Sequence, residues 1–164
     1  MMPEVLAACG RAADAERVMP RKKEFYEEIE HQLRPVAGAV EFVCWAAGRY
    51  RLALATSATP RNRDKAIGML GIEPCFETIV DTDRFQHAKP DPEIFQVAMR
   101  DLRLTPSDCW IVEDSLAGVG AGKASGTFTV GITTTFEREA LMGAGADMVV
   151  DSFAELRRVL ESTS

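Results

Sequence analysis

Polar side chains that could bind a phosphate or a metal ion follow two apolar runs of this sequence. Thr56 and Ser57 follow one run, and Glu113 and Asp114 follow another. Hydroxyls and backbone amides in a strand-to-helix turn suit an anion. Two adjacent carboxylates suit a hard cation such as Mg²⁺. Acids at a helix N-terminus are also stabilised by the helix dipole alone, so the carboxylate pair by itself leaves both interpretations open.

A lysine lies between these two places, in a stretch that proline makes stiff. Lys89 is followed by Pro90 and Pro92, whose fixed φ angles restrict the direction of the loop. An ammonium group held in one direction near strand ends suits a phosphate. A solvated surface lysine in a turn is the commoner alternative.

The elements that must position these residues are short apolar runs alternating with helical segments. The predicted strands are 51–55, 77–80, 109–112, 128–131 and 147–150, and the predicted helices are 60–70, one from 91 onward, 115–125 and 153–160. This alternation indicates βαβ units, and therefore an α/β fold with a parallel, Rossmann-like sheet flanked by helices. In such sheets the ligands bind at the carboxyl ends of the strands, where Thr56 and Glu113 are expected.

The first third of the chain is helical in pattern. Residues 4–18 are rich in alanine and charge, and residues 21–34 place Phe25, Ile29 and Leu33 on one stripe. Pro35 ends that helix, and a third predicted helix covers residues 36–47.

Composition limits the classes of protein that this chain can be. The 164 residues predict one domain, with room for a small appendage. The net charge of -6 argues against a nucleic-acid partner. No apolar run is long enough to span a membrane, and the N-terminus does not resemble a signal peptide. Four cysteines that lie far apart in the sequence indicate buried thiols in a reducing compartment, so we expect a cytoplasmic protein.

The order of these motifs resembles the haloacid dehalogenase (HAD) superfamily, and within it the group of β-phosphoglucomutase and phosphoglycolate phosphatase. Leu54-Ala55-Thr56-Ser57 matches the second motif, Lys89 the third-motif lysine, and Ile111-Val112-Glu113-Asp114-Ser115 the fourth motif. The resemblance covers residues 21 to about 160. It implies that residues 1–34 are the remnant of a helical cap and that residues 35–164 form the α/β core.

The resemblance also implies the chemistry of each matched residue. Thr56 and Ser57 would bind the transferring phosphoryl group, and Lys89 would balance the charge of phosphate and nucleophile. Glu113 and Asp114 would hold Mg²⁺. The expected function is therefore a Mg²⁺-dependent phosphatase that acts on a small phosphorylated metabolite.

One departure from the family pattern is large. The family's first motif, an apolar strand that ends in Asp-x-Asp-x-Thr/Val and carries the nucleophile, is not found before Thr56. Asp81-Thr82-Asp83 has the spacing, but it follows the second motif and has Phe85 where Thr or Val belongs, so we interpret it as a polar turn. Whether this chain by itself is an enzyme is thus left open. A truncated chain, a split gene and a natural loss remain alternatives.

The missing strand would normally lie between strands 52–55 and 109–112. We expect these two strands to pair directly within one chain, or a homodimer or complementing chain to fill the gap, and we favour direct pairing. Unpaired strand edges would favour aggregation.

Other functions have weaker support in the sequence. A β-phosphoglucomutase-like enzyme would need side chains that hold a second phosphate near Ala58 and Pro60, and neither residue can donate a side-chain hydrogen bond. A non-catalytic phosphate- and Mg²⁺-binding remnant, or half of a two-chain enzyme, also remains open. A receiver domain is disfavoured because its acidic pair would come before the Thr and Lys. The glycine-rich stretch 118–125 does not fit a phosphate loop, because Ala117 stands where the first Gly is required and Ala124 where Ser or Thr is required. His31 and His87 have no second His or Cys at zinc-ligand spacing.

Overall fold

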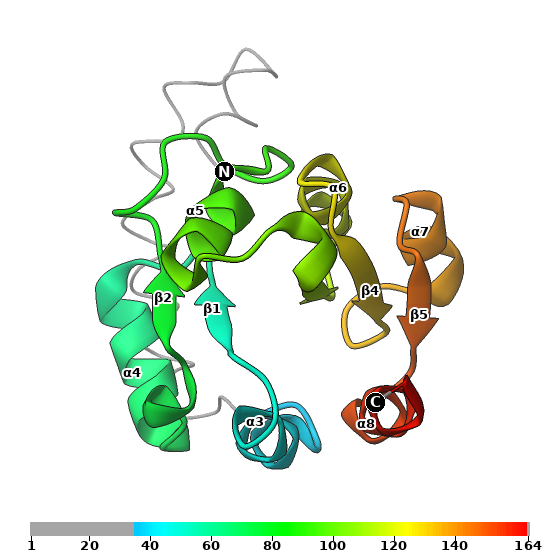
Figure 1. Ribbon diagram of the computed structural model, residues 1–164, viewed down its shortest axis with the longest axis horizontal. Helices are drawn as coiled ribbons and strands as arrows, with labels where there is room; N and C mark the ends of the chain where they lie inside the picture. Colours follow the sequence, from blue (N-terminus) through cyan, green and yellow to red (C-terminus); the bar gives the residue numbers. More distant parts are fainter. Residues whose placement is uncertain (1–34, 164) are drawn as a thin grey trace, which may run out of the picture. The chain divides into compact units, whose positions relative to one another are not determined.

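The fold is known from a computed structural model, which describes residues 35–163. Short strands alternate with helices, as the sequence predicts. The strands are β1 (Ala53–Ala55), β2 (Thr78–Val80), β3 (Trp110–Glu113), β4 (Phe128–Ile132) and β5 (Met148–Val150). The helices are α3 (Ala39–Ala47), α4 (Pro60–Leu70), α5 (Glu93–Leu102), α6 (Leu116–Ala124), α7 (Arg138–Gly143) and α8 (Phe153–Thr163), with 3₁₀ turns η2 (Glu73–Cys75) and η3 (Pro106–Asp108) (Figure 1).

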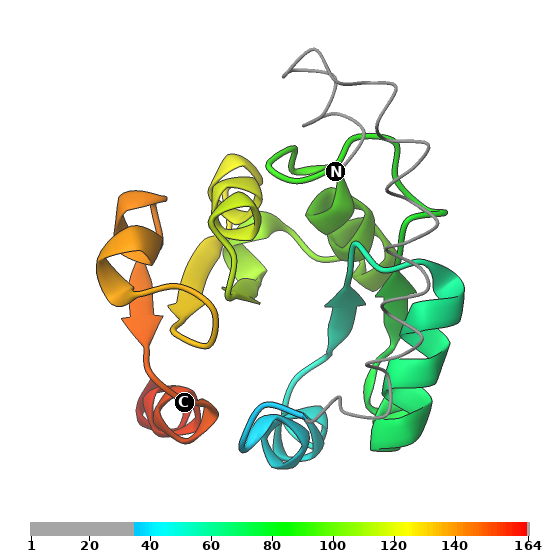
Figure 2. The ribbon, with the colours of Figure 1, turned by 180° about the vertical axis from the view of Figure 1, so that it is seen from behind.

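The strands form two parallel sheets. β1 pairs with β2, and β3, β4 and β5 form the second sheet in that order. The prediction of a parallel α/β fold is therefore confirmed. The prediction that strands 52–55 and 109–112 pair directly is wrong, because within residues 35–163 β1 and β3 belong to different sheets. Figures 1 and 2 show the two sheets as separate groups of arrows.

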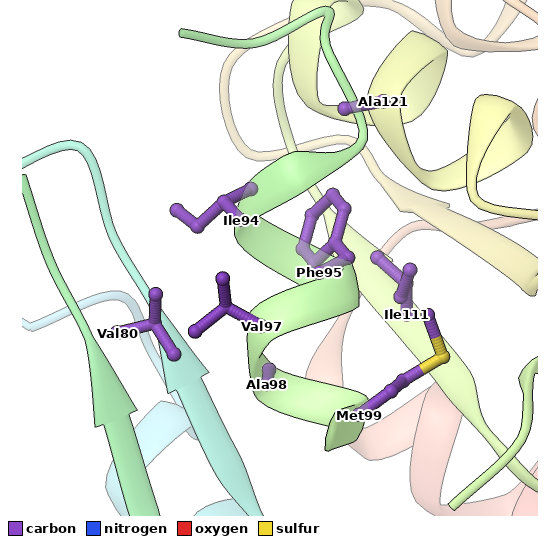
Figure 3. Close-up of a cluster of buried hydrophobic side chains, with 8 residues drawn as sticks. All are labelled: Val80, Ile94, Phe95, Val97, Ala98, Met99, Ile111 and Ala121. Atoms are coloured by element: carbon purple, nitrogen blue, oxygen red, sulfur yellow. The ribbon is translucent and has the colours of Figure 1, made fainter. Parts of the chain in front are cut away.

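Helix α5 explains why the two sheets do not close onto each other. Its apolar residues recur at helical spacing, and its two apolar sides contribute to one buried cluster that includes Val80 of β2 and Ile111 of β3. Figure 3 shows Val97 near Val80, while Phe95 and Met99 lie near Ile111. Since side chains from both sheets already pack against one helix, sliding β1 onto β3 would disrupt this close-packed core.

Residue types at their ends explain how several helices begin and end. Pro60 occupies the first turn of α4, where a missing N–H costs nothing. Gly71 ends the same helix with a φ of 66°, a left-handed conformation that glycine adopts at no steric cost. Ser115 caps α6, and its side chain accepts a hydrogen bond from the Gly118 amide. Thr59 stands at the N-cap of α4, but its side chain makes no capping bond.

Helices α3 and α8 pack against each other beside the second sheet. The rings of Phe42 in α3 and Phe153 in α8 have centroids 5.4 Å apart. Phe42 and Phe153 also pack against the buried cluster that includes Val130 of β4 and Leu156 of α8. The helix that precedes β1 is thereby attached to the last helix of the domain.

Further predictions from the sequence concern the cysteines and the first 34 residues. Cys44 is exposed, so the prediction that the cysteines are buried is wrong for this residue. The predicted cap remnant, residues 1–34, lies outside the described residues, and the division into cap and core stays a prediction. Among the helices of the described range, none has both the length and the hydrophobicity to cross a bilayer.

Candidate active site

The third and fourth motifs meet in a nearly buried ion pair. Lys89 lies in the loop after β2, and Glu113 is the last residue of β3. The Lys89 Nζ donates to Glu113 Oε1. Their side chains are 11% and 9% exposed, and Nζ also lies 4.9 Å from the centre of the Phe95 ring. This contact joins the loop that follows the first sheet to the carboxyl end of a strand in the second.

The start of α6 holds the other oxygen of Glu113. The Ser115 hydroxyl donates to Glu113 Oε2 at 3.1 Å and accepts from the Gly118 amide at 3.0 Å. A side chain at position 118 would overlap the Glu113 carboxylate, because an added Cβ has no room beside it. Small residues therefore let α6 pack close to the sheet here and at Gly122, where an added Cβ would lie 2.6 Å from the Thr129 hydroxyl.

Asp114 points to a different set of partners. Its Oδ2 accepts hydrogen bonds from the Thr135 hydroxyl at 2.5 Å and from the Thr134 hydroxyl at 3.3 Å. Both threonines follow β4, and no sequence motif identifies them as partners of Asp114. The two adjacent carboxylates thus have separate roles in the structure, since Glu113 binds the lysine and Asp114 binds hydroxyls of the next loop.

The donor set near Asp114 fits Mg²⁺ in part. Carboxylate oxygens are ligands that Mg²⁺ prefers, and Mg²⁺ in proteins usually keeps several waters. Within residues 35–163, however, Glu113 and Asp114 have no third acid, His or Cys that completes a cluster with them. Glu113 is also neutralised by Lys89. These residues therefore supply one or two protein ligands, and the rest of a coordination shell would be water or substrate.

Thr56 lies at the carboxyl end of β1, where the sequence predicts it. Its amide donates to the Val80 carbonyl at 2.9 Å, and its hydroxyl accepts from the Ala58 amide at 3.1 Å. Ser57 beside it is exposed. Among the residues that the structure describes, no hydrogen bond or ion pair links Thr56 to Lys89 or Asp114, so the second motif is placed by the sheet of β1 and β2.

Asp81 directly follows β2 and is only 2% exposed. Its carboxylate is paired with Arg63 of α4 and accepts from the Asp83 amide at 3.0 Å. Asp81 and Asp83 therefore form the polar turn that the sequence favours, and Arg63 is a partner that the sequence does not identify.

A second group of titratable side chains lies at the start of α5, close to Lys89 in the sequence. Glu93 accepts from the amides of Gln86 and His87 at 2.9 and 2.7 Å and contacts the His87 ring at 2.9 Å. The His87 amide, followed by the Gln86 amide, lowers the pKa of Glu93. Asp91 accepts from the Glu93 amide. Potential ligand atoms of His87, Asp91 and Glu93 lie within 4.8 Å of one another. The hydrogen bonds given above already explain this proximity, because they hold the three residues in a structured turn before α5.

Comparison with known proteins assigns this arrangement to a family. Residues 4–126 match the haloacid dehalogenase-like hydrolase family. β-Phosphoglucomutase from Bacillus subtilis is 32% identical over 148 residues, which are 88% of this chain and 62% of that protein. The phosphorylated carbohydrates phosphatase from Thermotoga maritima is 34% identical over 136 residues, which are 82% of this chain and 62% of that one.

A solved structure supports the same assignment at the level of the fold. A hydrolase from Pseudomonas syringae superposes with a TM-score of 0.84 and 23% identity, and the match covers 96% of this chain and 76% of that one. The chain spans less than two thirds of the length of the two enzymes above. With its alternating parallel strands and its Lys89–Glu113 pair, the chain belongs to the haloacid dehalogenase-like hydrolase family.

Proposed function

We propose that this protein takes part in Mg²⁺-dependent hydrolysis of a small phosphorylated metabolite. The observation that carries the proposal is the Lys89–Glu113 pair, which holds an ammonium group at the carboxyl end of β3. Membership of the hydrolase family supports this reaction class. Relatives named for phosphorylated carbohydrates support small phosphorylated substrates.

Each residue of the candidate site has a distinct task in this proposal. The Thr56 hydroxyl and the amide of Ser57 bind the transferring phosphoryl group. Lys89, oriented by Glu113, offsets negative charge as the phosphoryl group moves. Asp114 would bind Mg²⁺, with Glu113 close by, and the cation would supply further charge neutralisation when bound.

The nucleophile must come from outside the described residues. Covalent phosphoryl transfer in this family pattern needs a carboxylate in line with phosphorus. The edges of β1 and β3 both lack a strand partner within residues 35–163. We propose that a parallel strand lying between them carries this carboxylate, and that a complementing chain supplies it, or a preceding segment if this chain is truncated.

The loop after β1 favours a phosphatase over a mutase. A mutase that uses a bisphosphate needs a second set of phosphate donors. Neither Ala58 nor Pro60 has a side-chain donor, and the Ala58 amide already donates to Thr56. Water is then the better acceptor of the phosphoryl group in this proposal.

Binding of inorganic phosphate tests the site without needing the nucleophile. Lys89→Met should weaken phosphate binding by about ten- to a hundredfold, because one hydrogen bond to a charged group contributes about 1.5–3 kcal/mol. Lys89→Met leaves the Glu113 carboxylate buried and unpaired, which destabilises the fold. The double variant Lys89→Met/Glu113→Gln removes that unpaired charge, and it should bind phosphate as weakly as Lys89→Met. Lys123→Met, which removes a lysine paired with Asp147, should bind phosphate normally. Equal binding by all four proteins in calorimetry would overturn the proposal.

Two further measurements address the metal and the reaction. Millimolar Mg²⁺ should change the chemical shifts of the protein, and this change should disappear in Asp114→Asn and persist in Asp151→Asn.

The chain alone should not hydrolyse p-nitrophenyl phosphate, whereas fusion to a designed N-terminal strand ending in Asp-x-Asp-x-Thr should restore turnover. Turnover by the unfused chain that Asp81→Asn abolishes would mean that the nucleophile has been wrongly assigned.

A further inference from the structure

Two cysteines that are 31 positions apart in the sequence come together in the fold. Cys44 lies in α3, and Cys75 is the last residue of η2. Residues of α3 and η2 have Cα atoms within 8 Å of one another. The Cys44 thiol is also one of the neighbouring groups that raise the pKa of Cys75, so the two cysteines lie close to each other where α3 and η2 meet. The linear sequence gives no sign of this proximity, because no Cys-x-x-Cys spacing is present.

The two thiols differ in their access to solvent. Cys44 is exposed and Cys75 is partly buried. Burial, with the neighbouring Cys44 thiol as a second cause, raises the pKa of Cys75. Cys44 is therefore the thiol that an external reagent reaches first, since accessibility and thiolate character govern the reactivity of cysteine.

Cys109 provides an internal contrast. It lies next to β3 and packs against the buried cluster around α5. Burial, followed by the charge of Asp108, raises the pKa of the Cys109 thiol. Cys109 is thus a partly buried thiol on a different element, and it serves as a matched control.

We propose that Cys44 and Cys75 form a site of reversible oxidation, at which an intramolecular disulfide is made by exchange with a low-molecular-weight disulfide such as glutathione disulfide. This inference does not depend on the proposed function.

The exchange balances in two steps. The Cys44 thiolate attacks one sulfur of glutathione disulfide, which forms a mixed disulfide and releases one glutathione thiolate. The Cys75 thiolate then attacks Sγ of Cys44, which forms the Cys44–Cys75 bond and releases the second glutathione. The two protons of the protein thiols end on the two released glutathiones. The protein loses two electrons and glutathione disulfide gains them.

The new bond would close a loop that contains part of the candidate active site. β1, Thr56 and α4 all lie between Cys44 and Cys75. Closing a loop restricts the unfolded chain and stabilises the folded state if the native geometry allows the bond. Oxidation should therefore raise the thermal midpoint of the protein, and reduction should reverse the change.

The test is oxidation of the purified full chain with glutathione disulfide, followed by alkylation and intact-mass analysis. The reduced protein should take up four alkyl groups, one for each cysteine, and the oxidised protein should take up two. Peptide mapping should find Cys44 linked to Cys75, and dithiothreitol should restore all four reactive thiols.

Single variants assign the bond. Cys44→Ser and Cys75→Ser should each abolish the intramolecular disulfide and the rise in thermal midpoint. Cys109→Ser should form the bond as the parent protein does. The proposal is overturned if four thiols stay reactive, if mapping links either cysteine to Cys9 or Cys109, or if the only product is a disulfide-linked dimer. Circular dichroism of each serine variant distinguishes a lost bond from a lost fold.

Discussion

Gly118 is the residue on which the geometry of the candidate site depends most directly. A Cβ at this position would overlap the Glu113 carboxylate, which Lys89 and Ser115 hold in place. Gly118→Ala should therefore displace Glu113 and lower the free energy of unfolding by about 1–3 kcal/mol, the usual cost of overpacking.

Gly68→Ala is the matched control for this prediction. Gly68 lies in α4 with nothing within 4 Å of an added Cβ. The change should stabilise the protein by about 0.5–1 kcal/mol, because alanine loses less backbone entropy than glycine in a helix. Urea denaturation measures both variants. A Gly118→Ala protein as stable as Gly68→Ala would contradict the close approach of Glu113 to α6.

At the scale of elements, Asp147 connects α6 to the pairing of β4 with β5. Its carboxylate accepts from Lys123 Nζ at 2.5 Å and from the Thr129 amide at 2.8 Å. Its own amide donates to the Thr129 carbonyl at 2.8 Å. The Lys123 side chain, followed by the Thr129 amide, lowers the pKa of Asp147. The ionised form therefore holds the start of β5 in register.

This lowered pKa predicts a pH dependence with a definite sign. A carboxyl whose pKa is lower in the folded state than in the unfolded state stabilises the fold at pH values above the unfolded pKa, which is about 3.9 for Asp. This stabilisation is lost as the pH falls through the pKa of the folded state. Asp147→Asn should be less stable than the parent by about 1 kcal/mol at pH 7, a value reduced for partial exposure. The difference should shrink below about pH 4. Denaturation curves at a series of pH values measure it, and a constant difference down to pH 2 would contradict the assignment.

At the scale of the whole molecule, helix α5 connects the two sheets through a shared buried cluster. Residues from β2, α5 and β3 share one buried cluster, so neither sheet has an independent core there. We therefore expect residues 36–163 to unfold in a single cooperative transition.

The two tryptophans report on this cooperativity from different places. Trp45 in α3 lies under the Arg157 guanidinium of α8, 4.9 Å from the ring centre. Trp110 in β3 stacks on Phe128 with centroids 4.6 Å apart. In Trp45→Phe and Trp110→Phe, the fluorescence of the remaining tryptophan should give the same denaturation midpoint as circular dichroism. Phe95→Ala should lower both midpoints, with a cost of about 3–5 kcal/mol. Separate transitions from the two tryptophans would show that the sheets unfold independently.

The sequence by itself determined most of the elements and the family. Apolar runs such as 109–112 and the helical segment from residue 91 onward predicted strands and helices that the structure contains, whereas α7 was not predicted. Pro60, Gly71 and Ser115 carry local signals, because proline, glycine and serine affect the backbone within a few residues of themselves. The motifs around Thr56, Lys89 and Glu113 also identified the family from short segments.

Only the tertiary structure decided which distant residues meet. The pairing of Lys89 with Glu113, the binding of Asp114 by Thr135 and the proximity of Cys44 to Cys75 all join separate elements. The separation of β1 from β3 was likewise not predictable from strand patterns. Each strand has the same apolar pattern whether or not both of its edges are paired, whereas the packing of β2 and β3 against α5 in one buried cluster depends on segments far apart in the sequence.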